Sequence, residues 1–379
     1  MTMLSRRTFS QTIAGSIAAA FTGPSLKISL AFSPVATVQA ASPILLNYNE
    51  NPYGPTPKAR AALANCAAIA NRYPDAAAKE LKAALAKKHN VAPENIALGC
   101  GSTEILKCAD AAFLAPQSNL VAPLPTFEAV LEYAQIGGAS SVTVPSTPEH
   151  GHDLKKMAAA CTSKTGVVYV CNPNNPTGTY VTHDDLATFI AAVPLSTLVL
   201  IDEAYFELAD APGYATAIDF IPQHPNVLVA RTFSKVYGMA GMRLGYGVGS
   251  PATIDMVSRH LVQDSINAAA IAAARASLDD PEGVAASREK LVHTRQWLCA
   301  ELNKDHRSYV PSQGNFVMID VGTDTTPVIA QFAEHGILVG RRFPSMPTFI
   351  RVTVGTQDEI KAFVVALRQI VPAPARKAA

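Results

Sequence analysis

The sequence predicts an α/β protein with a mostly parallel central sheet flanked by helices, followed by a smaller α+β domain at the C-terminus. From about residue 96, short runs of Val, Ile and Leu alternate with segments of helical periodicity, which is typical of strands buried on both faces of a parallel sheet. From about residue 276 the pattern changes to a long helical segment followed by two further strands. The length of 379 residues, 49% of them hydrophobic, is sufficient for both parts.

The first forty residues have the composition of an export signal. Arg6 and Arg7 precede a short apolar run, Ile13 to Phe21, and "VQAAS" then offers a small-residue cleavage site. The apolar run is too short to span a bilayer as a helix. The paired arginines favour the twin-arginine export route, which implies the export machinery as a partner and a periplasmic or secreted location. An ordinary Sec signal or an uncleaved anchor is the alternative.

The mature chain is expected to begin near Ala41 and to contain three parts. Residues 41–75 form an N-terminal arm rich in Asn and Pro, whose placement the sequence does not indicate. Residues 76–275 form the large domain, with the strands "NIALG", "NLVAP", "SVTVP", "GVVYVC", "STLVLID" and "NVLVART" and helical segments such as 182–192 between several of them. Residues 276–379 form the small domain, with helices at 281–304 and 325–335 and the strands "NFVMID" and "FIRVTV".

The composition argues against several other functions. A net charge of +1 gives no reason to expect nucleic acid or an anionic membrane surface as a partner. The six cysteines show no paired framework, so no disulfides are predicted. His150 and His152 lie beside acidic residues in a Gly/Pro loop, but no further ligands follow at a fitting spacing, so no metal site is predicted.

Polar residues follow four of the predicted strands, at the point where each strand ends. Ser102 and Thr103 come after "NIALG", "CNPNNPTG" comes after "GVVYV", Asp202 closes "TLVLI", and Lys235 follows "NVLVART". Ligands of parallel α/β sheets bind outside the carboxyl ends of the strands. The coincidence of four such ends is therefore a stronger signal than any one motif, and it predicts a ligand site at this edge.

The residue types at these ends fit pyridoxal 5′-phosphate. Ser102 and Thr103 begin a helix, where free backbone amides attract phosphate, although Ser and Thr also cap helices generally. Arg243 can add a bidentate contact to the same phosphate. A buried Asp202 requires a cationic partner, and a protonated pyridine nitrogen is such a partner; the alternatives are a structural pair with an arginine or a role as a helix cap. Lys235, in an apolar segment near other positive charge, is expected to have a lowered pKa and to act as an amine nucleophile. Neither a P-loop nor a dinucleotide motif is present.

The chain resembles the histidinol-phosphate aminotransferase branch of the fold-type I pyridoxal phosphate-dependent aminotransferases. The resemblance runs from "LNYNENPYGPTPKA" to "RVTVGTQDE", nearly all of the mature chain, and includes "NRYPD", "GCGSTE", "CNPNNPTGT", "IDEAYFE" and "RTFSKVYGMAGMRLGYGVG". It implies a transaminase that moves an amino group between an amino acid and a 2-oxo acid.

The resemblance also implies a role for each matching residue. Lys235 would bind the cofactor covalently and move the proton during catalysis, and Asp202 would pair with the pyridine nitrogen. Tyr73 would reach the cofactor phosphate of a neighbouring subunit, which implies a homodimer. Arg351 would bind the substrate α-carboxylate, and Tyr53 would lie near the substrate side chain. The remaining cofactor contacts would come from Asn175 and Tyr205 at the phenolic oxygen, Phe127 stacked on the ring, and Ser102, Thr103, Ser234 and Arg243 at the phosphate.

Two departures from the family pattern bear on the substrate. Phe127 stands where tyrosine is common, so stacking on the ring is kept but a hydroxyl hydrogen bond is lost. Gly340 stands where an arginine for the substrate phosphate is expected, and Arg341 is displaced by one position. The sequence therefore predicts poor use of histidinol phosphate and better use of ordinary amino acids, aromatic or aliphatic. A decarboxylase of the same branch and a catalytically silent exported binding protein are the alternative functions.

Overall fold

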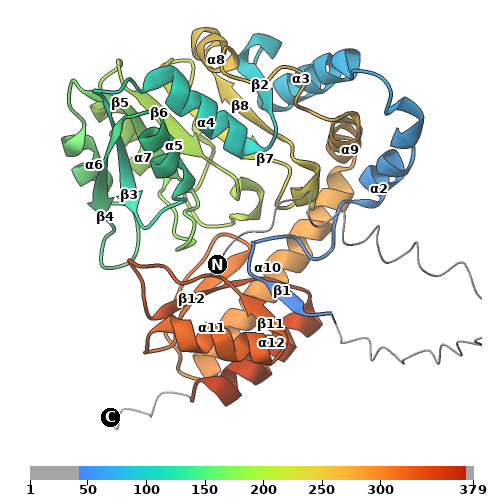
Figure 1. The fold of residues 1–379 in the computed structure, drawn as a ribbon, viewed down its shortest axis with the longest axis vertical. Helices are drawn as coiled ribbons and strands as arrows, with labels where there is room; N and C mark the ends of the chain where they lie inside the picture. Colours follow the sequence, from blue (N-terminus) through green and yellow to red (C-terminus); the bar gives the residue numbers. More distant parts are fainter. Residues whose placement is uncertain (1–41, 373–379) are drawn as a thin grey trace, which may run out of the picture. The chain divides into compact units, whose positions relative to one another are not determined.

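The computed structural model describes residues 42–372 (Figure 1), so the expected signal peptide at 1–40 lies outside the described residues. The main sheet has seven strands in the order β2-β8-β7-β6-β5-β3-β4. All adjacent pairs are parallel except the two that include β8. The predicted mostly parallel sheet is therefore confirmed. Its strands are β2 (Ile96–Gly99), β3 (Asn119–Leu124), β4 (Ser140–Pro145), β5 (Thr165–Cys171), β6 (Leu198–Asp202), β7 (Val227–Thr232) and β8 (Gly245–Gly249).

Helices cover both faces of this sheet, and its central strands β5, β6 and β7 are therefore buried on both sides and largely apolar. Along β5, Val168 and Val170 belong to one buried cluster, while Val167 and Tyr169 belong to the cluster on the opposite face. The first cluster is completed by α3 (Asp75–His89), α6 (Leu154–Ala160), α7 (His183–Ala192) and α9 (Ala268–Leu278). The second is completed by α4 (Ser102–Phe113), α5 (Ala129–Ile136) and α8 (Pro251–Ser258).

Strand β8 was not predicted, because "GYGVG" has few residues that favour strands. Its glycines serve the packing of α4 instead. A Cβ atom on Gly245 would collide with the backbone nitrogen of Ser102, and one on Gly247 would lie 3.0 Å from Ile105. Because Gly245 and Gly247 have no side chains, the start of α4 packs directly on the sheet, and this contact fixes the position of Ser102.

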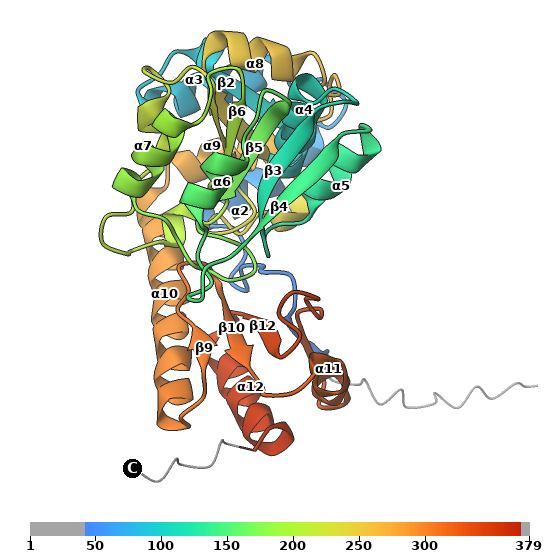
Figure 2. The ribbon, with the colours of Figure 1, turned by 90° about the vertical axis from the view of Figure 1, so that its left-hand side faces the viewer.

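The C-terminal part begins with the long helix α10 (Pro281–Lys304), which Figure 2 shows extending from the main sheet's helices to the second sheet. That sheet is antiparallel, with β10 (Phe316–Asp320) between β9 (Tyr309–Val310) and β12 (Phe349–Thr353). Helices α11 (Thr325–Glu334) and α12 (Gln357–Ile370) pack on it around a separate apolar cluster. The helices predicted at 281–304 and 325–335 correspond to α10 and α11.

The N-terminal arm connects the two sheets. Its strand β1 (Ile44–Leu46) pairs in parallel with β11 (Ile337–Val339) of the C-terminal part. Its helix α2 (Pro57–Ala64) packs against α9 beside the main sheet, and a short 3-10 helix, η1 (Cys66–Ile69), follows. Residues 47–50, between β1 and α2, therefore cross from one part to the other.

The remaining features concern the length of the helices and the surroundings of the His and Cys side chains. Among residues 42–372, no helix is both long and apolar enough to cross a membrane. The same residues contain no group of three or more His, Cys, Asp or Glu side chains arranged to hold a metal ion. His152 is buried and its Nε2 lies 2.8 Å from the carbonyl oxygen of Cys171, while the His150 ring packs edge-on against Phe349. All six cysteines are free thiols.

Candidate active site

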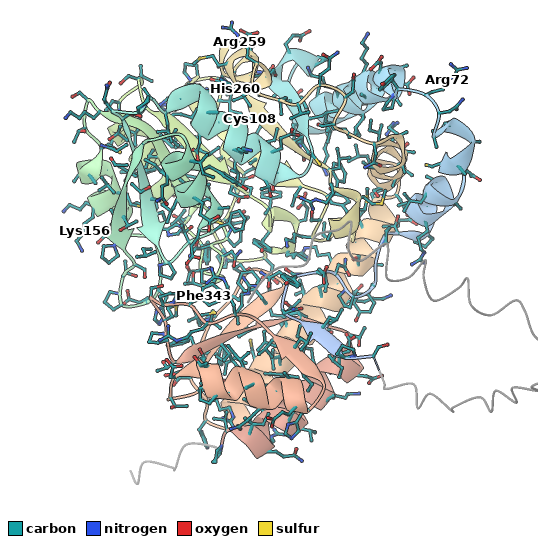
Figure 3. All side chains as sticks on the ribbon, in the orientation of Figure 1. Arg72, Cys108, Lys156, Arg259, His260 and Phe343 are labelled. Atoms are coloured by element: carbon teal, nitrogen blue, oxygen red, sulfur yellow. The ribbon has the colours of Figure 1, made fainter. Side chains whose placement is uncertain are left out.

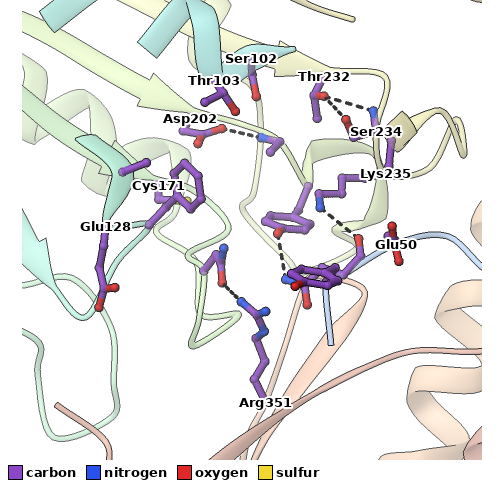
Figure 4. Close-up of a pocket in the computed structure, with 18 of the residues that line it drawn as sticks. Glu50, Ser102, Thr103, Glu128, Cys171, Asp202, Thr232, Ser234, Lys235 and Arg351 are labelled. Carbon is purple, nitrogen blue, oxygen red and sulfur yellow. Dashed lines mark hydrogen bonds between the residues drawn. The ribbon is translucent and has the colours of Figure 1, made fainter. Parts of the chain in front are cut away.

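A cavity of about 770 Å³ lies at the carboxyl ends of the parallel strands, between the main sheet and the C-terminal part (Figure 4). Every site residue that the sequence predicts lines it, except Tyr53 and Tyr73. These lining residues are Ser102, Thr103, Phe127, Asn175, Asp202, Tyr205, Ser234, Lys235, Arg243 and Arg351. The strand ends and the C-terminal sheet thus bring side chains from distant parts of the chain to one cavity.

Lys235 places its amine in this cavity, just after β7. Its Nζ donates a hydrogen bond to the carbonyl oxygen of Asn49 at 3.0 Å and lies 5.2 Å from the centre of the Tyr205 ring. Burial, and then the positive charge of Arg351, lower the pKa of Lys235 to about 8. A minor fraction of this amine is therefore unprotonated at neutral pH, far more than for an ordinary lysine, and can act as a nucleophile or as a base.

Asp202 supplies a buried negative charge at the end of β6. Its carboxylate accepts hydrogen bonds from the Tyr169 hydroxyl and from the backbone N–H of Ala204, both at 3.1 Å. Burial raises the pKa of Asp202 to about 6. Among the described residues no cationic group lies within ion-pair distance of it, because the buried arginine nearby, Arg231, pairs with Glu203 instead. The structural-arginine alternative therefore does not hold, and a protonated pyridine nitrogen fits the site.

A site for phosphate lies at the N-terminus of α4. The helix begins at Ser102, so the first backbone N–H groups have no acceptor in a preceding turn. Gly101 has φ of +79°, and a Cβ atom there would collide with the guanidinium of Arg243, which packs closely over the helix start. The hydroxyl of Ser234 accepts a hydrogen bond from Thr232 at 2.9 Å on the same side of the cavity. Amides, hydroxyls and one guanidinium together suit a dianion.

Arg351 brings a second guanidinium into the cavity from β12. Its Nη1 donates to Oδ1 of Asn175 at 2.7 Å and its Nη2 donates to the carbonyl oxygen of Asn47 at 2.8 Å. Both acceptors are neutral, and the buried Nε has no hydrogen-bond partner in the described chain. Burial lowers the pKa of Arg351. A largely desolvated cation that has only neutral partners attracts a carboxylate ligand.

Tyr53 and Tyr73 lie away from this cavity. Tyr73 is 77% exposed and lines a different depression, together with Arg72 and Asn267. The backbone N–H of Tyr53 bonds to the Asn51 side chain, and its ring lies 5.0 Å from Nζ of Lys290. The roles expected for these two tyrosines therefore stay predictions.

Several cavity residues were not predicted. Asn47, Asn49 and Glu50 of the arm line it, as do Thr232, Glu128 and Phe343. The polar run "LNYNEN" was the available signal for the arm residues, but their place depends on the pairing of β1 with β11.

The interpretation of Gly340 and Arg341 requires a correction. Arg341 lines the cavity, so its displacement by one position does not remove it from the site. Gly340 has no room for a side chain, because a Cβ atom there would lie 2.7 Å from the carbonyl oxygen of Arg351 and 3.1 Å from its Cβ. The glycine is thus required by the close approach of β12, and a guanidinium is still present at the substrate end.

Comparison with known proteins shows which family the chain resembles in sequence and in fold. The chain is 40% identical over 332 residues to histidinol-phosphate aminotransferase 2 of Pseudomonas fluorescens, covering 87% of this chain and 89% of the relative. It is 41% identical over 323 residues to the aromatic amino acid aminotransferase of Rhodococcus jostii, covering 85% and 88%. Its fold matches the crystal structure of histidinol-phosphate aminotransferase from Sinorhizobium meliloti in complex with pyridoxal 5′-phosphate, with a TM-score of 0.82, 28% identity and coverage of 87% and 91%.

The family model for aminotransferase class I and II matches residues 41–367, which contain every cavity residue described above. Lys235, Asp202 and the start of α4 offer an amine, a carboxylate and free amides that would suit the aldehyde, ring nitrogen and phosphate of pyridoxal phosphate. The protein therefore belongs to the class I and II aminotransferase family and is a pyridoxal phosphate-dependent transaminase.

Proposed function

We propose that the enzyme transfers the amino group of an α-amino acid with an uncharged, aromatic or aliphatic side chain to a 2-oxo acid. The observation that carries this proposal is the guanidinium of Arg351, which lies in the Lys235 cavity and bonds only to neutral acceptors among the described residues. The ring of Phe343, whose centre lies 5.4 Å from Cζ of Arg351, supplies an apolar surface next to the carboxylate position. Relatives at about 40% identity are named for histidinol phosphate or for aromatic amino acids.

The roles of the residues follow from their positions. Pyridoxal phosphate, when bound, supplies an electron sink that stabilises negative charge on the substrate α-carbon. Arg351 holds the α-carboxylate and so fixes the orientation of the substrate. The Nζ of Lys235, with a pKa of about 8, accepts the proton from the α-carbon. Asp202 holds the compensating negative charge, and Phe127 lines the same cavity.

Decarboxylation of an amino acid in the same cavity is the second candidate. Whether the enzyme transaminates or decarboxylates depends on which bond of the substrate α-carbon breaks. Because Arg351 binds the carboxylate as a charged group, and loss of CO₂ would leave that buried guanidinium without its anion, the geometry favours transamination. If the enzyme consumed an amino acid and released CO₂ without forming a 2-oxo acid, decarboxylation would be the correct assignment.

The experiment that tests the proposal is Arg351→Lys. Lysine keeps the charge but cannot form two parallel hydrogen bonds to a carboxylate, so kcat/KM for neutral α-amino acids should fall by about tenfold or more. Steady-state assays of aromatic and aliphatic donors against histidinol phosphate measure the change. Arg342→Lys is the matched control, because Arg342 pairs with Asp324 outside the cavity. Histidinol phosphate as the best wild-type donor by a wide margin would contradict the proposed substrate class.

We also propose that the enzyme works as a homodimer in which Tyr73 reaches the cofactor phosphate of the partner subunit. The exposed ring of Tyr73 and its distance from its own cavity support this. Tyr73→Phe should weaken cofactor binding about tenfold, because one hydrogen bond to a charged group is lost, without changing the melting temperature of the apoprotein. Cofactor titration measures the effect, with Tyr180→Phe as the control. A monomer with full activity would disprove the proposal.

The remaining proposal concerns location. "SRRTFS" and the short apolar run support twin-arginine export of the folded, cofactor-loaded protein to the periplasm or the medium. Replacing both Arg6 and Arg7 by lysine should leave the precursor in the cytoplasm, as measured by fractionation and blotting. Unchanged export of that double variant would show that a different route is used.

A further inference from the structure

Asn49, in the arm that crosses between the two sheets, has a hydrogen bond at every polar atom. It is buried, and it lines the cavity at the junction of the two parts, where Figure 3 labels another lining residue, Phe343. Its φ of +55° lies in the left-handed region, which asparagine adopts more readily than most residues. Its carbonyl oxygen accepts hydrogen bonds from Nζ of Lys235 and Nδ2 of Asn315, both at 3.0 Å, and a dashed line in Figure 4 marks the first.

A buried threonine determines which way the side-chain amide of Asn49 faces. The backbone N–H of Asn49 donates to Oγ1 of Thr353 at 2.8 Å. The hydroxyl proton of Thr353 is donated to Oδ1 of Asn49, 3.2 Å away, and has no other acceptor in the described chain. Because the amide oxygen is bonded to Thr353, the amide nitrogen faces the other way. Nδ2 therefore donates to the hydroxyl oxygen of Tyr205, at 3.0 Å.

This arrangement determines the direction of the Tyr205 hydroxyl proton. The Tyr205 ring is buried and packs edge-on against Phe316, with ring centres 5.1 Å apart, so the hydroxyl can turn only about its C–O bond. A phenol hydroxyl has one proton, and its oxygen already accepts the Asn49 amide. The proton therefore cannot point at Asn49, and among residues 42–372 it has no other acceptor. It is left to donate into the cavity, which Tyr205 lines.

We propose that Asn49 is a positioning residue, which directs the hydroxyl proton of Tyr205 toward the phenolic oxygen of bound pyridoxal phosphate. This inference rests on the predicted contact between Tyr205 and that oxygen. An ionised phenolic oxygen attracts a proton donor and repels a lone pair, so a Tyr205 hydroxyl turned the other way would weaken cofactor binding. Asn49 also accepts the hydrogen bond from Lys235, so one position of the arm orients two side chains of the cavity.

Two substitutions test the side chain of Asn49 while keeping its backbone conformation. Asn49→Asp keeps the size of the side chain and tolerates a positive φ, but it replaces the amide donor by a carboxylate oxygen, toward which Tyr205 would turn its proton. Asn49→Gly adopts a positive φ without strain and keeps the carbonyl that binds Lys235, so it should fold even if the first variant does not. Asn90→Asp and Asn90→Gly are the matched controls, because Asn90 has φ of +53° and does not line the cavity.

The experiment measures by calorimetry how the full-length apoprotein binds pyridoxamine 5′-phosphate and its deoxy analogue, which lacks the phenolic oxygen. The preference for the first ligand, as a ratio of Kd values, should fall about tenfold or more in Asn49→Asp and about threefold in Asn49→Gly. A general loss of packing would weaken both ligands and leave the ratio unchanged. Tyr205→Phe should lower the ratio about tenfold, and adding Asn49→Gly to it should cause no further fall. The Asn90 variants should keep the wild-type ratio.

The outcomes separate the role of Asn49 from that of Tyr205. An unchanged ratio in both Asn49 variants, with a lowered ratio in Tyr205→Phe, would overturn the role of Asn49 alone. If Tyr205→Phe left the ratio unchanged, the predicted contact of Tyr205 would fail and the inference with it. An effect of Asn49→Gly that persists in the Tyr205→Phe background would show that Asn49 does not act through Tyr205. None of these results depends on the amino donor, so Arg351→Lys tests the proposed substrate class separately.

Discussion

Replacing Lys235 by alanine should lower kcat by about 10⁴-fold or more, because the roles proposed for this side chain are to bind the cofactor and to move the substrate proton. No other lysine lines the cavity in the described chain, so no neighbouring amine can replace it. The purified wild-type enzyme should be yellow, and the variant should lack the visible absorbance of covalently bound cofactor. Single-turnover absorbance measurements with an added amino acid record both properties.

Lys164→Ala is the control for this variant, because Lys164 is exposed and does not line the cavity. Removing the buried amine also removes the free-energy cost of burying its charge, which offsets the loss of packing. Lys235→Ala should therefore lower the free energy of unfolding of the apoprotein by at most about 1–2 kcal/mol. A wild-type protein that stays colourless after cofactor is added would refute the assignment of Lys235. So would a Lys235→Ala variant that retains turnover.

Asp202→Asn should have two opposite effects. Activity should fall by about 100-fold or more, because loss of one partner from a buried charge pair costs about 3–5 kcal/mol. The apoprotein should instead become more stable at neutral pH, because a buried carboxylate without a cation is replaced by a neutral amide. The expected gain is about 1–3 kcal/mol, since each pH unit between the folded and unfolded pKa values corresponds to about 1.4 kcal/mol. Turnover assays and denaturant unfolding measure the two effects.

The stability effect has a defined pH dependence. Burial raises the pKa of Asp202 from 3.8 to about 6, so between these values the folded apoprotein binds more protons than the unfolded chain. Its stability therefore falls as pH rises through this range, and the cost is fully present above pH of about 6. The difference between Asp202→Asn and wild type should accordingly vanish below about pH 3 and reach its full value near pH 7. A difference independent of pH would show that the carboxylate is not the cause.

The sequence was sufficient to predict the parts of the site that depend on local pattern and on sheet edges. Asp202 and Lys235 follow apolar strands, and parallel strands bring their carboxyl ends to one edge, so their convergence could be expected before any coordinates. The helices α10 and α11 were also predicted from their helical pattern, and the structure shows that the side chains of Asp280 and Asp324 cap their first turns.

The unpredicted parts depend on contacts between distant segments. Strand β8 is glycine-rich, and its role is visible only when α4 is seen packed on Gly245. The sequence alone could not show that Arg341 lines the cavity. Gly340 is a glycine because it packs closely against Arg351, which only the structure reveals. Glu128 has no pattern that distinguishes it from any helix-starting acid, so its pairing with Arg341 required the three-dimensional arrangement.

The N-terminal arm, which crosses from one sheet to the other, affects how the enzyme folds during translation. The carbonyl oxygen of Asn49 receives the hydrogen bond from Lys235, while the backbone N–H of Asn49 donates to Oγ1 of Thr353 at 2.8 Å, across a separation of 304 residues. Synthesis proceeds from the N-terminus, so the arm emerges first but its last partner emerges almost at the end of translation. Contacts of such long sequence separation form late, because the intervening chain must be ordered before they can stabilise it. Nascent chains that end before β12 should therefore contain a folded main sheet but no competent cofactor cavity.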